Sequence, residues 1–318
     1  MNILVTGGSG FIGTRLIENL LTEGHIVKIF DKAMSEKYPK LTTIGDVRNV
    51  EALTTACKDI NVIYHLAAEH ADNVTPLSLY DDVNVGGAEN VVSATKANSS
   101  VKRIIFTSSV AIYGLDKGVC DESFMPDPFN EYGRSKLKAE EVFLKWQAEE
   151  ENNTLIMLRP SAVFGETNRG NIYNLLKQVH SGKFVVIGKG ENKKSIGYVG
   201  NISAFLAYLS DNKSGLEIYN FSDKPDMSAR QMVDFIQKTL GRNKRIPSVP
   251  YALGLLGGYA FDLLSKITGK KFAVSSIRIK KFAADTAINT DRMQNSGFNP
   301  PFTFEEGLKR TIENEFMN

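Results

Sequence analysis

Short apolar runs alternate with amphipathic segments along the first half of the chain. The runs predict strands at 3–6, 26–30, 41–44, 62–66, 104–107 and 155–158, and helical periodicity fills most of the gaps, at 14–23, 50–58, 82–97 and 132–149. Short apolar strands separated by helices are typical of a parallel sheet that is covered on both faces. We therefore predict an α/β fold of the doubly wound, Rossmann type, which binds ligands at the carboxyl ends of its strands.

In the second half of the chain, the alternation of strands and helices is less regular. Helices are predicted at 171–181, 201–210, 228–240, 253–267 and 304–316, with a short strand at 184–187. We expect residues 1–165 to form a dinucleotide-binding domain and residues 166–318 to form most of a smaller, C-terminal substrate-binding lobe. A segment near 200–222 is expected to return to the main sheet.

One later stretch is unusually apolar, at 251–264. It is too short to span a bilayer, and glycines and Asp262 interrupt it. A packed helix or a lid over 251–267 is the favoured interpretation, with a dimer contact or a membrane-surface helix as alternatives.

Composition and charge exclude few classes of protein. The 318 residues are 42% hydrophobic and 23% charged, and the net charge of +2 gives no argument for nucleic acid or for acidic membranes. Neither the two cysteines nor the four histidines are spaced as metal ligands, and two cysteines make no disulfide framework. Because the chain opens on a predicted buried strand, MNILVTG, we expect a cytoplasmic protein without a signal peptide or an integral membrane segment.

A glycine motif follows the first predicted strand. In TGGSGFIG, residues 6–13, Gly7, Gly10 and Gly13 are spaced three apart and open a helix. Glycines allow a tight turn and a close approach of the backbone to a pyrophosphate, which the helix N-terminus then binds. The motif predicts a dinucleotide site, although a plain strand-to-helix turn would show the same glycines.

Acidic residues after the next two strands bear on the cofactor. Asp31 ends the second strand, where a carboxylate would bind the adenosine ribose and repel a 2′-phosphate, so NAD is favoured over NADP. The neighbouring Lys32 leaves room for NADP. Asp46 follows the third strand and is placed either to contact adenine or to cap the helix that begins near Asn49.

A lysine lies on the inward stripe of the predicted helix at 132–149. Tyr132, Lys136, Ala139, Phe143 and Trp146 follow spacings of 4, 3, 4 and 3, so they share one face. The lysine could extend its ammonium to water along an apolar stem. Alternatively, the tyrosine and the lysine form a working pair in which the ammonium lowers the pKa of the phenol.

The combination of motifs resembles one family. TGGSGFIG, HLAA at 65–68 and YGRSK at 132–136 are similar to the extended short-chain dehydrogenase/reductases, in the NAD-dependent epimerase/dehydratase group that acts largely on nucleotide sugars. TSSVAIYG at 107–114, LRPSAVFG at 158–165 and GFNPPFTFEEGLKRTI at 297–312 extend the resemblance over essentially the whole chain.

The resemblance implies a role for each matching residue. Tyr132 would be the general acid/base, Lys136 would lower its pKa and bind the nicotinamide ribose, and Ser109 would hydrogen-bond the reacting oxygen. Ser108 is the alternative if the alignment slips by one residue, and Asn84 would brace a strand or a water near the site. The implied cofactor contacts are Gly7, Gly10, Phe11, Ile12, Gly13, Asp31, Lys32, Asp46, Val47, Leu66, Ala67, Ala68, Ser108, Tyr132, Lys136 and Pro160. The implied substrate contacts are Ser109, Asn171, Lys194 and Arg278.

The reaction that the resemblance implies is C4 epimerisation of a nucleotide-diphosphate sugar. Val110 and Ala111 stand where dehydratases carry an Asp-Glu pair, which argues against dehydration. Ala162 and Lys194 replace an asparagine and an arginine common among epimerases, and 251–267 resembles keto-sugar reductases, so a 4-keto reductase is a near-equal alternative. A hydroxysteroid-type dehydrogenase and a non-catalytic NAD-sensing regulator are weaker ones. The family resemblance also implies a homodimer through the helices at 82–97 and 132–149.

Overall fold

A parallel sheet of seven strands organises the structure. The computed structural model describes residues 1–71, 74–210, 214–270, 272 and 274–317. The strands lie in the order β11-β6-β5-β4-β1-β2-β3. Their bounds are β1 Asn2–Thr6, β2 Ile26–Asp31, β3 Thr42–Ile44, β4 Val62–His65, β5 Arg103–Thr107, β6 Thr154–Pro160 and β11 Leu216–Phe221. The predicted doubly wound fold is confirmed, and the chain reverses its direction across the sheet beside β1, where such folds bind ligands.

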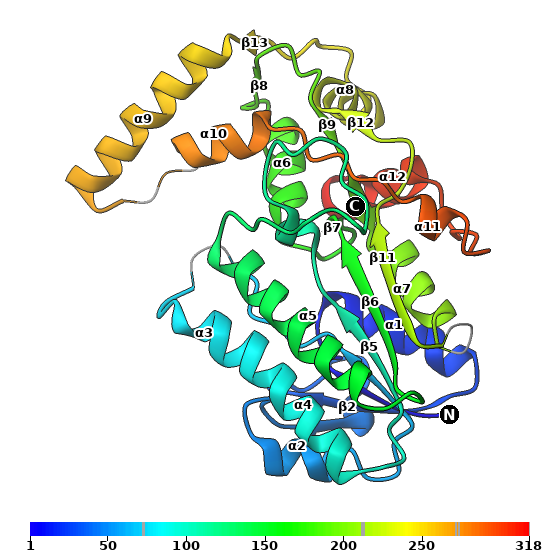
Figure 1. Cartoon of the computed structure of the whole chain (residues 1–318). Helices are drawn as coiled ribbons and strands as arrows, with labels where there is room; N and C mark the ends of the chain where they lie inside the picture. Colours follow the sequence, from blue (N-terminus) through cyan, green and yellow to red (C-terminus); the bar gives the residue numbers. More distant parts are fainter. Residues whose placement is uncertain (72–73, 211–213, 271, 273, 318) are drawn as a thin grey trace.

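Helices cover both faces of this sheet (Figure 1). One core is formed with α2 (Val50–Ala56), α4 (Gly86–Ala97) and α5 (Glu131–Glu149), and the other with α1 (Phe11–Thr22) and α7 (Val199–Tyr208). The short elements between them are η1 Pro39–Leu41, α3 Ser78–Tyr80, the π-helical turn η2 Asp81–Val85 and the 3-10 turn η3 Val110–Tyr113. The strand interiors are apolar on both faces because each face is buried under helices.

A smaller lobe is built above the carboxyl ends of the strands. Its helices include α6 Asn171–His180, α8 Ala229–Thr239 and α12 Phe304–Phe316, whereas α11 Asp291–Gln294 packs against β11 of the main sheet. Three short strand pairs accompany them: β7 Ala162–Phe164 with β10 Ile196–Tyr198, β9 Lys193–Lys194 with β12 Met227–Ser228, and β8 Val186–Ile187 with β13 Ser248–Val249. Between α7 and α8 the chain returns to the main sheet as β11. The predicted division into two domains at residue 165 therefore stays a prediction.

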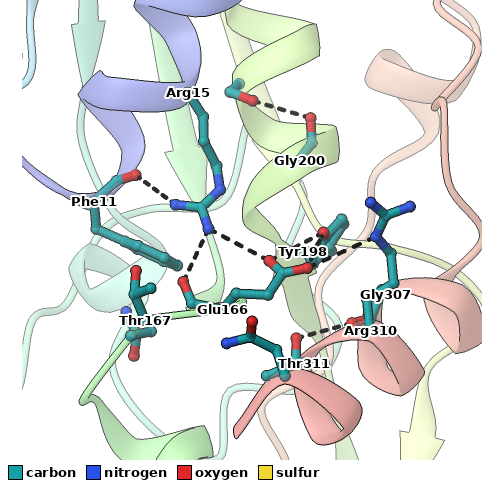
Figure 2. A network of polar contacts seen from close by, with 12 residues as sticks. Phe11, Arg15, Glu166, Thr167, Tyr198, Gly200, Gly307, Arg310 and Thr311 are labelled. Carbon is teal, nitrogen blue, oxygen red and sulfur yellow. Dashed lines mark hydrogen bonds and ion pairs between the residues drawn. The ribbon is translucent and has the colours of Figure 1, made fainter. Parts of the chain in front are cut away.

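A charged network joins this lobe to the glycine-motif helix (Figure 2). Arg15 of α1 donates to the main-chain oxygen of Glu166 over 2.9 Å. The Glu166 carboxylate accepts a 2.8 Å hydrogen bond from the Tyr198 hydroxyl, and Arg310 of α12 lies 3.7 Å from it. Because these residues come from four separate segments, the network fixes the lobe against the sheet.

The apolar segment near 251–267 forms a long helix that projects from the lobe (Figure 1). This helix, α9, spans Tyr251–Thr268 and packs against α10, Ser276–Ala283. Gly258 is its only buried residue among those the structure describes. The helix therefore packs through a face of small residues and leaves its leucines exposed, while the lid, dimer-contact and membrane-surface interpretations stay predictions. None of the helices in the described parts of the chain is long and apolar enough to cross a membrane.

Candidate active site

The glycine motif forms a tight turn between β1 and α1. Gly7 adopts a φ of +73°, and a side chain there would bring Cβ within 2.6 Å of the Ala67 nitrogen. A Cβ on Gly13 would lie 2.6 Å from the Gly7 carbonyl oxygen. Gly10 precedes α1 without a side-chain cap, so the first N–H groups of the helix are left for a ligand. Phe11 and Ile12 form the first turn of the helix, and Leu66, Ala67 and Ala68 follow β4 beside the glycines.

Asp31 lies at the carboxyl end of β2, beside this turn. Its carboxylate accepts hydrogen bonds from the backbone N–H groups of Ser9, at 2.9 Å, and Ala33, at 3.0 Å. Lys32 is exposed and lies 3.9 Å from Glu69. The aspartate is thus held between the glycine turn and its own loop, where it meets a dinucleotide ribose in folds of this type.

Asp46 does not cap α2. Asn49 is the cap, and its side-chain oxygen accepts a 3.0 Å hydrogen bond from Ala52. Asp46 instead pairs with Arg48 at 2.6 Å, and this hydrogen bond lowers the pKa of the carboxyl group. The capping interpretation of Asp46 is wrong because the helix begins one residue after Asn49. Val47 is buried between Asp46 and α4.

The structure brings Ser109, Tyr132 and Lys136 together after the carboxyl end of β5. Ser109 caps η3 and accepts a 3.1 Å hydrogen bond from the Ala111 N–H. Its side chain is also hydrogen-bonded to the phenol of Tyr132, the second residue of α5. The Asn130 cap fixes the start of that helix by accepting from the Gly133 N–H over 2.8 Å. Lys136 follows one turn later and donates to the Thr107 carbonyl oxygen over 2.6 Å.

Burial controls the electrostatics of this cluster. Only 2% of Lys136 is exposed, so the interpretation in which its ammonium reaches water is wrong. Burial lowers the pKa of Lys136 to about 7, against an opposing effect of Glu140. Burial raises the pKa of Tyr132, and the hydrogen bond with Ser109 offsets part of that rise.

The expected lowering of the tyrosine pKa by Lys136 is therefore absent in the protein alone. The lysine donates to Thr107, lies over the ring of Phe106 at 4.3 Å, and is itself driven towards neutrality. A weakly charged ammonium gives little electrostatic support to a phenolate.

A buried ion pair behind the cluster was not foreseen from the sequence. Glu140 lies one turn after Lys136 on α5 and pairs with Arg159 of β6 at 2.7 Å. Arg159 also donates to the Tyr113 hydroxyl over 2.8 Å, which donates in turn to Asn220 of β11 over 2.8 Å. The network ties α5 to η3 and to the sheet, so it holds Tyr132 against Ser109. In the sequence, the feature that could have indicated this pair is Arg159 near the end of a predicted buried strand, because a buried arginine requires a buried partner.

Other predicted residues surround the cluster. Asn84, in the π-helical turn η2, donates to the Ser135 hydroxyl over 2.8 Å and accepts from the Glu69 N–H over 2.8 Å. It therefore connects α5 to the loop after β4. Ser108 is buried at the end of β5, and its hydroxyl has no partner within the described structure. Pro160 is buried at the end of β6.

The predicted substrate contacts of the lobe lie on three different elements. Asn171 begins α6 and is exposed, Lys194 lies on β9, and Arg278 lies on α10 and is exposed. Lys194 donates to the Ala284 carbonyl oxygen, and burial lowers the pKa of its ammonium to about 8. Arg278 donates to the Phe272 carbonyl oxygen over 3.3 Å. The roles of Asn171, Lys194 and Arg278 as substrate contacts therefore stay predictions.

Comparison with known proteins gives consistent matches over the whole chain. The model of the NAD dependent epimerase/dehydratase family matches residues 3–221. The chain is 51% identical over 321 residues to the N-acetyl-alpha-D-glucosaminyl-diphospho-ditrans,octacis-undecaprenol 4-epimerase of Escherichia coli O157:H7, with 100% of this chain and 96% of that protein covered. It is 27% identical to the UDP-glucose 4-epimerase of Vibrio cholerae, covering 98% and 94% of the two chains.

A solved structure supports the fold. The UDP-glucose 4-epimerase of Thermus thermophilus, in complex with NAD, superposes with a TM-score of 0.75 over 99% of this chain and 98% of its own, at 20% identity.

Proposed function

We propose, from the premise that the chain belongs to the NAD-dependent epimerase/dehydratase family, that it inverts C4 of an N-acetylhexosamine joined through a diphosphate to a polyprenol. The chain is an NAD-dependent epimerase. The observation that carries the choice of substrate is the 51% identity over its full length to an epimerase named for such a lipid. A nucleotide-diphosphate sugar, which the sequence motifs alone favoured, is the second candidate, supported by the 27% identical relative.

The residues of the β1–α1 turn fit NAD. Gly7, Gly10 and Gly13 leave the space that side chains would fill, the N-terminus of α1 is uncapped, and the Asp31 carboxylate lies beside it. Asp46, Val47, Leu66, Ala67, Ala68, Ser108 and Pro160 are proposed to complete the contacts, with Phe11, Ile12 and Lys32. When bound, NAD supplies the acceptor that takes a hydride from C4 and returns it.

The three clustered side chains would handle the proton. We propose that Tyr132 acts as a phenolate, which the positive charges of bound NAD and of a protonated Lys136 would favour, and that it takes the proton of the C4 hydroxyl during oxidation and returns it during reduction. Ser109, already hydrogen-bonded to the phenol, would donate to the same sugar oxygen and keep it within reach. Lys136 would hold the nicotinamide ribose in place of its present contact with Thr107. Inversion further requires that the oxidised sugar rotate in the lobe before the hydride returns.

The reaction can be tested with purified protein and two substrates that carry the same sugar, polyprenyl-diphospho-N-acetylglucosamine and UDP-N-acetylglucosamine. Chromatography with mass detection after mild acid release separates N-acetylglucosamine from N-acetylgalactosamine. Turnover of the lipid substrate without added dinucleotide is expected. Turnover of the nucleotide sugar alone would select the second candidate. Inversion of neither substrate, together with consumption of NADH when a UDP-4-keto sugar is supplied, would select a 4-keto reductase.

The assembly and cellular setting belong to the same proposal. A homodimer through α4 and α5 follows from the family resemblance, and these two helices lie side by side on one face of the sheet. We place the protein in the cytoplasm, in the synthesis of a surface polysaccharide. Light scattering at two protein concentrations would give the mass, and a monomer at both would remove the dimer from the proposal.

A further inference from the structure

The helix α9 presents its large apolar side chains to solvent. Its exposed stripe consists of Leu253, Leu256, Ala260, Leu263, Leu264 and Ile267, which follow spacings of 3, 4, 3, 1 and 3 and so share one helical face. Leu256 is 64% exposed, Leu263 60% and Ile267 71%. A contiguous stripe of this kind differs from scattered surface leucines and marks an interaction surface.

The opposite face of α9 attaches it to the lobe through small side chains. A Cβ on Gly258 would meet backbone and side-chain atoms of α10 at 2.8 Å, and a Cβ on Gly254 would lie 3.0 Å from Ile187. The Asp262 carboxylate accepts a 3.1 Å hydrogen bond from the Ser276 N–H. An ordinary surface helix buries its leucines and exposes its small or polar residues. In α9 the leucines are exposed and the glycines face the protein, and the contacts with α10 hold the helix in this orientation.

The segment that carries the stripe has a strongly positive net charge in sequence, although the net charge of the whole chain is small. In sequence, residues 251–283 contain Asp262 as the single acid against a basic set of Lys266, Lys270, Lys271, Arg278, Lys280 and Lys281. The carboxylate of Asp262 accepts a hydrogen bond from the Ser276 N–H within the protein. Tyr259 lies beside the stripe under the Lys280 ammonium, at 5.7 Å. An apolar face bordered by cations and an aromatic ring is typical of helices that lie in the interface of an anionic bilayer.

The same element is continuous with the lobe above the active site. The chain leaves α10 into Ala284, whose carbonyl oxygen accepts from Lys194. It then pairs at Ile288 with Cys120, in the segment between η3 and α5. A surface that holds α9 against a bilayer would therefore place this lobe, rather than the sheet, next to lipid.

We infer that α9 and α10 form a membrane-docking surface for a bilayer containing anionic lipids, with the stripe buried among the acyl chains and Lys266, Lys270 and Lys280 at the headgroups. The inference rests on the proposed function for its purpose, since a polyprenol carrier stays in the bilayer while its sugar must reach Tyr132. Charge complementarity favours lipid over a second copy of this chain, because two such surfaces would bring like charges together.

Vesicle flotation tests the surface without turnover. The full chain is expected to float with vesicles of phosphatidylcholine and phosphatidylglycerol, less with phosphatidylcholine alone, and less as salt rises. The variant Leu256→Glu/Leu263→Glu should lose at least about tenfold in binding, since burying each charge costs more than the roughly 1.4 kcal/mol of a tenfold change. Ile26→Glu/Met125→Glu, which changes two exposed apolar residues elsewhere, is the matched control and should float normally.

Activity separates this inference from the proposed function. The stripe variant should keep its rate on a short-chain, water-soluble prenyl-diphosphate substrate and lose rate on the same sugar presented in vesicles. Equal flotation of the wild type and the stripe variant would overturn the docking surface. If the wild type were a dimer and the stripe variant a monomer, with no difference in flotation, the stripe would be a dimer contact and not a docking surface. Normal flotation without epimerisation of either substrate would leave the surface standing and refute the proposed function.

Discussion

The Lys136 ammonium donates to the Thr107 carbonyl oxygen over 2.6 Å, so the last residue of β5 fixes the lysine of α5. The contact holds a buried cation at the place where the sheet presents its ligands. It also leaves Tyr132 with Ser109 as its hydrogen-bond partner and without a strong cation beside it. In the protein without cofactor, the three side chains are therefore in position, but the pKa of Tyr132 is not yet lowered for proton transfer.

Lys136 should make the stability of the cofactor-free protein depend on pH. Its pKa is about 7 in the folded state and about 10.4 when unfolded, so the folded state binds fewer protons between these values and stability rises with pH. Relative to Lys136→Met, the free energy of unfolding should gain up to about 1.4 kcal/mol per pH unit between roughly pH 7.5 and 10. Urea unfolding at several pH values measures this, with Lys138→Met as the exposed control. Parallel curves for wild type and Lys136→Met would show that the lysine titrates normally.

Tyr132→Phe should abolish most epimerisation while leaving the fold and NAD binding in place. Removing a general acid/base costs about 10²–10⁴-fold in rate. The rate is measured on whichever substrate the wild type uses, and the melting temperature and NAD titration are measured beside it. Tyr38→Phe removes the same hydroxyl from a residue outside the catalytic cluster and should retain full activity. A Tyr132→Phe enzyme within a few-fold of wild type would exclude the assigned role.

The buried pair of Glu140 and Arg159 predicts a strong non-additivity. Glu140→Leu leaves a buried guanidinium without its carboxylate and should destabilise the protein by about 3–5 kcal/mol. Adding Arg159→Met should restore much of that loss, since both charges are then gone. Glu141→Leu, on the exposed face of the same helix, should change stability by less than about 0.5 kcal/mol. Additive losses in chemical denaturation would contradict the pairing.

Gly13→Ala should weaken NAD binding and stability together. Its Cβ would lie 2.6 Å from the Gly7 carbonyl oxygen, so the turn must shift. Gly86→Ala meets its nearest neighbouring atom at 3.8 Å at the start of α4 and should instead stabilise by about 0.5–1 kcal/mol. Fluorescence titration with NADH and thermal unfolding compare the two. Equal NADH affinity in both variants would mean that the glycine spacing serves packing only.

Asp31→Ala should reduce discrimination between NAD and NADP. The carboxylate accepts two backbone hydrogen bonds at the glycine turn, and its charge would repel a 2′-phosphate. We expect NAD affinity to fall while NADP affinity holds or rises, and calorimetric titration of both dinucleotides measures the ratio. An unchanged ratio would place the selectivity elsewhere, with Lys32 as the next residue to change.

The features that follow from local pattern were predicted well, and those set by long-range contacts were not. The sheet, the glycine turn and the bounds of α12 follow from periodicity and capping residues near each other in sequence. The placement of Ser109 beside Tyr132 required the family resemblance, because two segments more than twenty residues apart meet there. The pKa of Tyr132 and the Glu140–Arg159 pair depend on burial and on which charges meet across the core. The orientation of α9 depends on α10, whose helix had not been predicted.

The return of the chain through β11 has a consequence for dissecting the protein. A fragment that ended at residue 165 would contain the complete glycine turn and all three clustered side chains, yet β6 would lose the neighbour to which it pairs along Leu155–Pro160. The bare edge would offer unpaired backbone groups to other chains, and the Arg159 network would lose Asn220. Such a fragment should aggregate, whereas co-expression with the remainder of the chain should rescue it by supplying the missing strand in trans.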